Sequence, residues 1–190
     1  MNIPRMQGRF KDVRTLYDDA TTFKSKGNDY FASKNYMKAK KQYHCALLQT
    51  RAISARDTVG RSMSFFDGAI NSELKYSESA DFKSAVENLE CSCNKNLAMI
   101  FISEGRWEKA LEYSRKALEF DENDEKALYR FSLAAINLDL IDDCTSTTER
   151  LLELKPESKL YIKMQADLRN KVNQQKSREK RLYQGMFLSN

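Results

Sequence analysis

The feature that most constrains this chain is a pattern of small and apolar residues that recurs within blocks of 34 residues. The pattern falls on positions 8, 11, 20, 24 and 27 of a block. In the block that starts at Ala20, these positions hold Gly27, Tyr30, Ala39, Tyr43 and Ala46. In the block that starts at Cys91, they hold Ala98, Phe101, Ala110, Ser114 and Ala117. Small residues at this spacing let two helices approach closely, so each block is predicted to be one helix-turn-helix unit.

A third block starts at Glu125, 34 residues after Cys91, and matches the pattern less closely. Its pattern positions hold Ser132, Ala135, Cys144, Thr148 and Leu151, and Leu-Lys-Pro closes it at Pro156. A 34-residue period is typical of the tetratricopeptide repeat (TPR). The predicted fold class is therefore all-α, a right-handed TPR solenoid of three helix-turn-helix repeats with a C-terminal capping helix.

Apolar periodicity and loop composition divide the chain into segments. We expect helices over 13–33, 36–56, 82–103, 107–120, 124–138 and 141–154. A last helix from Ser158 has Tyr161, Met164, Leu168 and Val172 on one face, which would cover the flank of the third repeat. The predicted organisation is an N-terminal extension 1–19, repeat 1 at 20–53, a segment 54–90, repeat 2 at 91–124, repeat 3 at 125–158 and the capping helix at 159–187. The segment 54–90 holds a Ser-rich insertion, expected as a long loop that partly extends the preceding helix, and the start of the next helix.

Composition restricts the cellular setting. The longest apolar stretches fall far short of the ~20 residues that span a bilayer, and no apolar core of a signal peptide follows the N-terminus. We therefore expect a cytoplasmic protein, with the nucleus as a second compartment, and no membrane partner. The formal net charge is +5, which favours acidic partners where the charge is concentrated. We expect a monomer without cofactors.

Five polar residues on the predicted first helices of the repeats lie outside the packing pattern. Lys24 and Asn28 are fifth and ninth in repeat 1, and Asn96 is sixth in repeat 2. Lys126 and Arg130 are second and sixth in repeat 3. This set resembles the clamp of the carboxylate-clamp co-chaperones, which has lysine, asparagine, asparagine, lysine and arginine at those positions. With each residue type present at about one site in twenty, a chance match of all five is on the order of one in a million.

The resemblance implies a ligand and a role for each residue. The ligand would be the Glu-Glu-Val-Asp tail of heat-shock protein 90 or heat-shock protein 70. Lys24, Asn28 and Asn96 would hold the terminal carboxylate, Lys126 the aspartate side chain, and Arg130 the upstream backbone or glutamate. Cations form charge-assisted hydrogen bonds with carboxylates, and asparagine amides orient those carboxylates without adding charge repulsion.

Longer segments support a family resemblance. The runs 24–31, 94–98, 126–130 and 179–187 look like the repeats and last helix of immunophilin-type co-chaperones. The run Gln-Tyr-His-Cys-Ala-Leu-Leu-Gln at 42–49 resembles a segment of the tetratricopeptide repeat protein 9 family. About twenty residues precede the first repeat, too few for an isomerase domain.

Other functions find less support. His44 is the only histidine, and neither a phosphate-binding loop nor a nucleophile motif is present, so no catalytic residue is assigned. The neighbouring His44 and Cys45 lack the second half-site that zinc requires, and we expect no metal. The basic residues Lys176, Arg178, Lys180 and Arg181 lack interleaved aromatics, so nucleic acid is not expected as a partner. The alternative that remains is a TPR scaffold or adaptor that binds a client or cytoskeletal protein without recognising chaperone tails.

Overall fold

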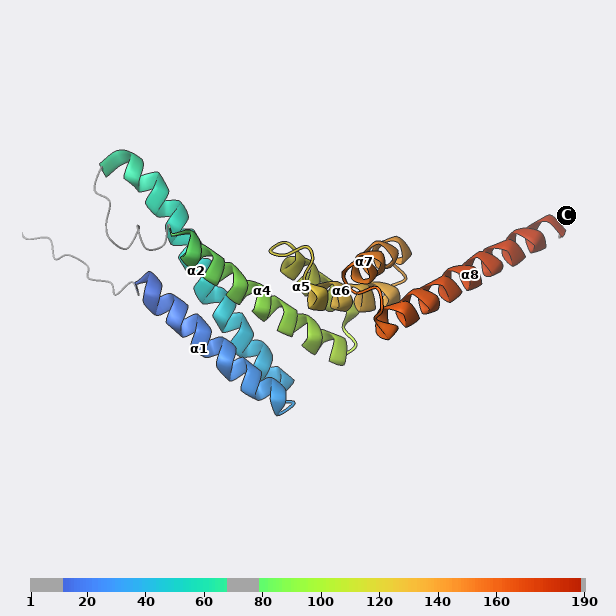
Figure 1. Ribbon diagram of the computed structural model, residues 1–190, viewed down its shortest axis with the longest axis horizontal. Coiled ribbons are helices and arrows are strands. Elements are labelled where there is room, and N and C mark those ends of the chain that lie inside the picture. Colours follow the sequence, from blue (N-terminus) through green and yellow to red (C-terminus); the bar gives the residue numbers. More distant parts are fainter. Residues whose placement is uncertain (1–11, 68–78, 189–190) are drawn as a thin grey trace, which may run out of the picture. The chain divides into compact units, whose positions relative to one another are not determined.

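The computed structural model describes the backbone of residues 12–67 and 79–188, with side chains for 12–56, 79–181 and Gln184. Every regular element within these residues is an α-helix, which confirms the predicted all-α class. The chain forms two compact units, Met1–Cys93 (unit 1) and Asn94–Asn190 (unit 2). The division falls inside the helix α4 (Ala80–Ser103), which contributes to both units (Figure 1).

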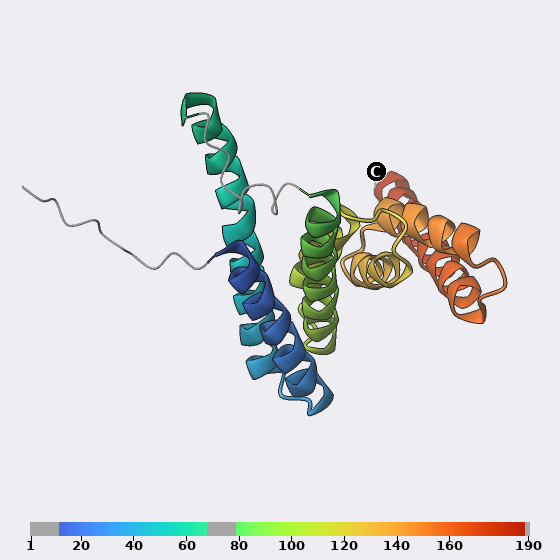
Figure 2. The same ribbon diagram turned by 60° about the vertical axis from the view of Figure 1, so that its left-hand side comes forward.

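Unit 1 is built on a hairpin of α1 (Val13–Ala32) and α2 (Tyr36–Asp67), which run side by side (Figure 2). The Asp12 carboxylate caps α1 by accepting from the Thr15 amide at 2.5 Å. At the start of α2, the Asn35 side-chain oxygen accepts from the Lys38 amide at 3.2 Å. These side chains satisfy amides that have no partner within the helix, so each helix has a defined start.

The predicted small residues lie where α1 and α2 meet. Ala20, Ala39 and Ala46 are fully buried, and Gly27 is buried opposite the ring of Tyr43. A second cluster joins α1, α2 and the first turns of α4, and it consists of Val13, Leu16, Ile53, Phe82 and Val86. Burying an apolar side chain of this size stabilises the fold by about 1.5–3 kcal/mol. The pattern that defined the first repeat therefore marks its helix interface.

The insertion is more helical than a long loop. α2 continues without a break to Asp67, well past the predicted end near residue 56. The stretch that continues α2 contains no proline and one glycine, Gly60, so little in it opposes helix propagation. Residues 68–78 of the insertion lie outside the described part of the chain.

Unit 2 contains the end of α4, then α5 (Trp107–Leu118), α6 (Glu125–Asn137), α7 (Ile141–Leu154) and α8 (Lys159–Leu188). α5 packs on α6, α6 on α7 and α7 on α8. The rings of Phe101 in α4 and Tyr113 in α5 stack with their centroids 5.3 Å apart. The predicted helix pairs are therefore present, with ends within two residues of their expected positions.

The core of unit 2 also follows the sequence pattern. One cluster holds Phe131, Ala135, Cys144 and Leu168, and another holds Leu128, Leu151 and Tyr161. The predicted face of α8 covers this core, since Tyr161, Met164 and Leu168 are buried. α8 continues beyond α7 (Figure 1), and residues 173–181 are all exposed.

The turns within the repeats share one geometry that the sequence pattern does not reveal. Lys34, Gly105 and Asp139 have left-handed backbones with φ of 58°, 68° and 59°, and each is position 15 of its repeat. The amide at position 16 then bonds the carbonyl at position 11, at 2.8, 2.9 and 3.0 Å in the three repeats. This is the Schellman ending of a helix, and it occurs in all three hairpins.

Candidate peptide-binding site

In unit 1, two of the five predicted site residues lie one turn apart on α1. Asn28 is exposed, and Lys24 is half-buried. Burial raises the pKa of the Cys93 thiol to about 12, and the positive charge of Lys24 opposes that rise. Lys24 therefore lies within electrostatic range of Cys93 in α4.

The side chain of Asn28 is oriented by a buried tyrosine. The Tyr43 hydroxyl, on α2, donates to Oδ1 of Asn28 at 2.8 Å. Because the amide oxygen accepts this bond, the amide nitrogen is the end that presents hydrogen-bond donors elsewhere. Donors are what a carboxylate ligand needs.

Gly27 makes this contact sterically feasible. A Cβ at residue 27 would lie 2.6 Å from Cε1 of Tyr43, inside van der Waals contact. The small residue at position 8 of the repeat thus admits the aromatic ring at position 24, and that ring reaches the asparagine at position 9. The sequence contained the signal for this arrangement, because all three residues stand at fixed repeat positions, but the pattern identified Tyr43 only as a packing residue.

In unit 2, three predicted site residues lie on α4 and α6. Asn96 is half-buried on α4. On α6, Lys126 is exposed and Arg130 is half-buried, one turn further along the same face. None of the five predicted residues is buried in the core of its unit.

An ion pair joins α4 to the start of α6. The Lys95 ammonium donates to Oδ2 of Asp124. Asp124 is also the N-cap of α6, and its Oδ1 accepts from the Ala127 amide at 2.8 Å. The pair places the turn of α4 that holds Asn96 beside the first turn of α6, which holds Lys126. Neither partner of this pair stands at a position of the repeat pattern.

Opposing effects determine the protonation of Asp124. Burial raises the pKa of its carboxyl, but the hydrogen bonds from Lys95 and the Ala127 amide outweigh burial and hold the pKa below its usual value. The positive charges of Lys95 and Arg130 act in the same direction. Asp124 is therefore a carboxylate at neutral pH, within electrostatic range of Arg130.

Glu125, the first residue of α6, has partners at the end of α7 and in α8. Its carboxylate accepts from Lys155 at 2.6 Å and from the Tyr161 hydroxyl at 2.5 Å. These two hydrogen bonds lower the pKa of Glu125, with the larger effect from Lys155. They tie α6 to the end of α7 and to the start of α8.

The residues that other functions would require lie on helices α2, α4 and α8. His44 is half-buried on α2, and Cys91 is buried in α4. Within the described residues, no group of three or more His, Cys, Asp or Glu side chains is arranged to hold a metal ion. Lys176, Arg178, Lys180 and Arg181 are exposed along α8. Among the described helices, none has the length and hydropathy of a transmembrane span.

Comparison with known proteins finds relatives among peptidyl-prolyl cis-trans isomerases named FKBP4. No family model matches the chain. It is 31% identical to the peptidyl-prolyl cis-trans isomerase FKBP4 of Mus musculus over 115 residues, 60% of this chain and 25% of that protein. With human FKBP4 it shares 27% identity over 172 residues, 90% of this chain and 32% of that protein. The chain thus spans a quarter to a third of the length of these relatives.

Solved structures establish the fold. The C-terminal TPR-containing domain of a putative FK506-binding protein of Plasmodium falciparum superposes with a TM-score of 0.70 at 20% identity, covering 89% of this chain and 97% of that domain. The Hsp90 co-chaperone Cns1 of Saccharomyces cerevisiae gives 0.62 at 19% identity, over 89% of this chain and 44% of Cns1. The first TPR domain of Spaghetti (RPAP3), bound to the HSP90 peptide SRMEEVD, gives 0.58 at 16% identity, over 83% and 95%. The fold of this chain is therefore that of a TPR domain.

Proposed function

We propose that this chain is a co-chaperone-type binding module that holds the acidic C-terminal tail of heat-shock protein 90 or heat-shock protein 70. Lys24, Asn28 and Asn96 bind the terminal carboxylate. Lys126 binds the side chain of the last aspartate, and Arg130 binds the upstream backbone or a glutamate. Together these five residues are the proposed carboxylate clamp.

The observation that carries the proposal is the match of all five residue types to clamp positions, in a register that the packing residues fix independently. Those packing residues are buried, except Tyr30, which is half-buried. Each cation of the clamp can form a charged hydrogen bond worth roughly 1.5–3 kcal/mol before entropy losses. A flexible tail loses conformational entropy on binding, so we expect a Kd in the micromolar range.

Local contacts within unit 1 support the role of Asn28. The Asn28 amide presents its donors because Tyr43 occupies its oxygen. The printed descriptions of Cns1 and of the RPAP3 domain, an Hsp90 co-chaperone and a domain bound to an HSP90 peptide, point to the same class of ligand.

The proposal extends to the protein family and to the cellular compartment. The run 42–49 and the three-repeat organisation support membership of the tetratricopeptide repeat protein 9 family. Binding to a cytosolic chaperone places the protein in the cytoplasm. The proposed function is binding without catalysis, and the isomerase activity named for FKBP4 is not assigned to this chain, which covers 25% of the mouse protein.

The experiment that tests the clamp measures the Kd of a Met-Glu-Glu-Val-Asp peptide by titration calorimetry for alanine variants of each site residue. Lys24→Ala and Asn28→Ala probe unit 1, and Asn96→Ala, Lys126→Ala and Arg130→Ala probe unit 2. Each lysine or arginine variant should weaken binding at least about tenfold, which corresponds to about 1.4 kcal/mol. The asparagine variants should weaken it about threefold or more, as expected for neutral hydrogen bonds.

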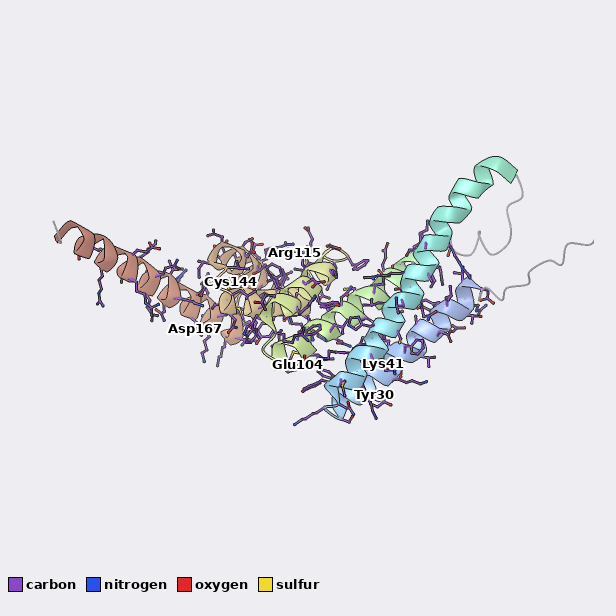
Figure 3. The ribbon with its side chains drawn as sticks, turned by 180° about the vertical axis from the view of Figure 1, so that it is seen from behind. Tyr30, Lys41, Glu104, Arg115, Cys144 and Asp167 are labelled. Atoms are coloured by element: carbon purple, nitrogen blue, oxygen red, sulfur yellow. The ribbon has the colours of Figure 1, made fainter. Side chains whose placement is uncertain are left out.

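Lys41→Ala serves as the matched control, because Lys41 is an exposed lysine on α2, outside the proposed clamp (Figure 3). This variant should bind the peptide as the wild type does. If variants in only one unit weaken binding, the shared clamp is wrong. If none does, the chain is a scaffold for other partners.

A further inference from the structure

We infer that Lys95 is a positioning residue of the proposed peptide site, because it keeps the Asp124 carboxylate from competing with the peptide for Lys126 and Arg130. The inference rests on the proposed function and adds a residue to it. It also identifies Asp124 as an internal carboxylate that would compete with acidic tails in the absence of Lys95.

The geometry of the ion pair assigns this role. Asp124 stands in the turn that starts α6, two residues before Lys126 and six before Arg130. Its two oxygens have separate partners: the Ala127 amide bonds Oδ1, and Lys95 bonds Oδ2. The Lys95 and Asp124 side chains are 18% and 17% exposed, so the pair is largely shielded from solvent and salt.

The chemistry of Asp124 makes it a competitor. A peptide ending in aspartate presents carboxylates to Lys126 and Arg130, and Asp124 carries the same chemical group at the start of the helix that holds both cations. The charge of Arg130 already acts on Asp124, which helps to lower the pKa of this carboxyl. With Lys95 present, the charges of the pair cancel, so Asp124 adds little negative potential at Lys126 and Arg130.

Loss of Lys95 changes this balance. Oδ2 of Asp124 would lose its ammonium partner, and Arg130, whose charge already acts on this carboxyl, would become an alternative partner. An uncompensated negative charge would also repel the acidic peptide directly. Both effects weaken peptide binding through Asp124, so removing the charge of Asp124 should reverse them.

The test is a double-mutant cycle on the full chain with the free-acid peptide Met-Glu-Glu-Val-Asp. Lys95→Met keeps the apolar stem of the side chain and removes its charge. Asp124→Asn removes the competing charge and retains a residue that caps helices as well as aspartate does. Lys41→Met, on the exposed surface of α2, is the control for loss of one positive charge.

We expect Lys95→Met to raise the Kd at least fivefold and Lys41→Met to change it less than twofold. Asp124→Asn alone should bind at least as tightly as the wild type. The double variant should return to within about threefold of the wild-type Kd. Circular dichroism melts confirm that each variant is folded at the titration temperature.

Several results would overturn the inference. A Lys95→Met variant that binds like the wild type shows that the lysine does not act on the site. A double variant as weak as Lys95→Met, or an Asp124→Asn variant weaker than the wild type, shows that the pair only supports the fold. Absence of wild-type binding refutes the proposed function itself, whereas wild-type binding that is insensitive to Lys95 refutes this inference alone.

Discussion

The hydroxyl of Tyr43 donates to the side-chain oxygen of Asn28 at 2.8 Å, which connects a buried packing residue of α2 to an exposed residue of α1. This hydrogen bond fixes which end of the Asn28 amide would face the proposed ligand. A packing residue of the repeat thus also determines the polarity of the proposed site.

Tyr43→Phe tests this orientation. The ring remains and only the hydroxyl is lost, so the fold should be retained. The Kd for the free-acid tail peptide should rise roughly two- to tenfold, the equivalent of one net hydrogen bond of about 0.5–1.5 kcal/mol. Calorimetric titration measures it, and Tyr36→Phe, in the same helix, is the control that should bind normally. Equal affinities for both variants would show that Asn28 is oriented in another way.

Gly27→Ala should destabilise unit 1, although alanine normally favours a helix over glycine. The added Cβ would meet the rigid Tyr43 ring at 2.6 Å, and such overpacking costs about 1–3 kcal/mol. Urea unfolding measures the change. Combined with Tyr43→Leu, the same substitution should cost less, because the clashing ring is gone. Additive effects in the double variant would contradict the proposed close contact.

The shared turn geometry leads to opposite predictions at two repeats. Lys34→Gly should raise the free energy of unfolding by about 0.5–1 kcal/mol, because glycine adopts the left-handed backbone without a steric penalty. Gly105→Ala should lower it by about 1–2 kcal/mol for the converse reason. A Cβ at residue 105 meets nothing within 4 Å, so the effect comes from the backbone alone. Changes of the same sign in both variants would argue against a common turn.

The lowered pKa of Asp124 predicts that the free energy of unfolding depends on pH. Its folded-state pKa lies below that of the unfolded chain, about 3.9, so its contribution is fully present above that value. The contribution is lost as the pH falls through the folded-state pKa. Asp124→Asn should therefore reduce the free energy of unfolding by on the order of 1 kcal/mol at pH 7. The difference between wild type and variant should shrink towards pH 3; a constant difference would contradict the assignment.

Much of the fold could be predicted because it depends on local periodicity. Buried residues such as Ala39 and Leu128 recur at helical spacing, so the helices and their pairing follow from the sequence. The left-handed turns could not be predicted in the same way, since two of the three are at Lys34 and Asp139, where no glycine signals them. The Ser-rich composition of the insertion favours a loop, whereas the scarcity of glycine and proline lets α2 continue to Asp67.

The candidate site was predicted through repeat register, which identifies residue types but not their supporting contacts. Lys95 and Asp124 are 29 residues apart, and no periodic pattern connects a lysine of one repeat to the cap of the next. Tyr43 was assigned to packing because its ring satisfies the pattern without any role for its hydroxyl. Such contacts depend on tertiary geometry, which becomes visible only when the helices are placed side by side.

The measurement that tests the central claim most directly is the affinity of the wild-type chain for one tail peptide with a free C-terminus and for the same peptide amidated. A carboxylate clamp predicts micromolar binding of the free acid, at least tenfold weaker binding of the amide, and loss of affinity for the free acid as salt is raised. Equal affinity for both peptides, or no binding of either, would contradict recognition of a chain terminus by Lys24, Asn28, Asn96, Lys126 and Arg130.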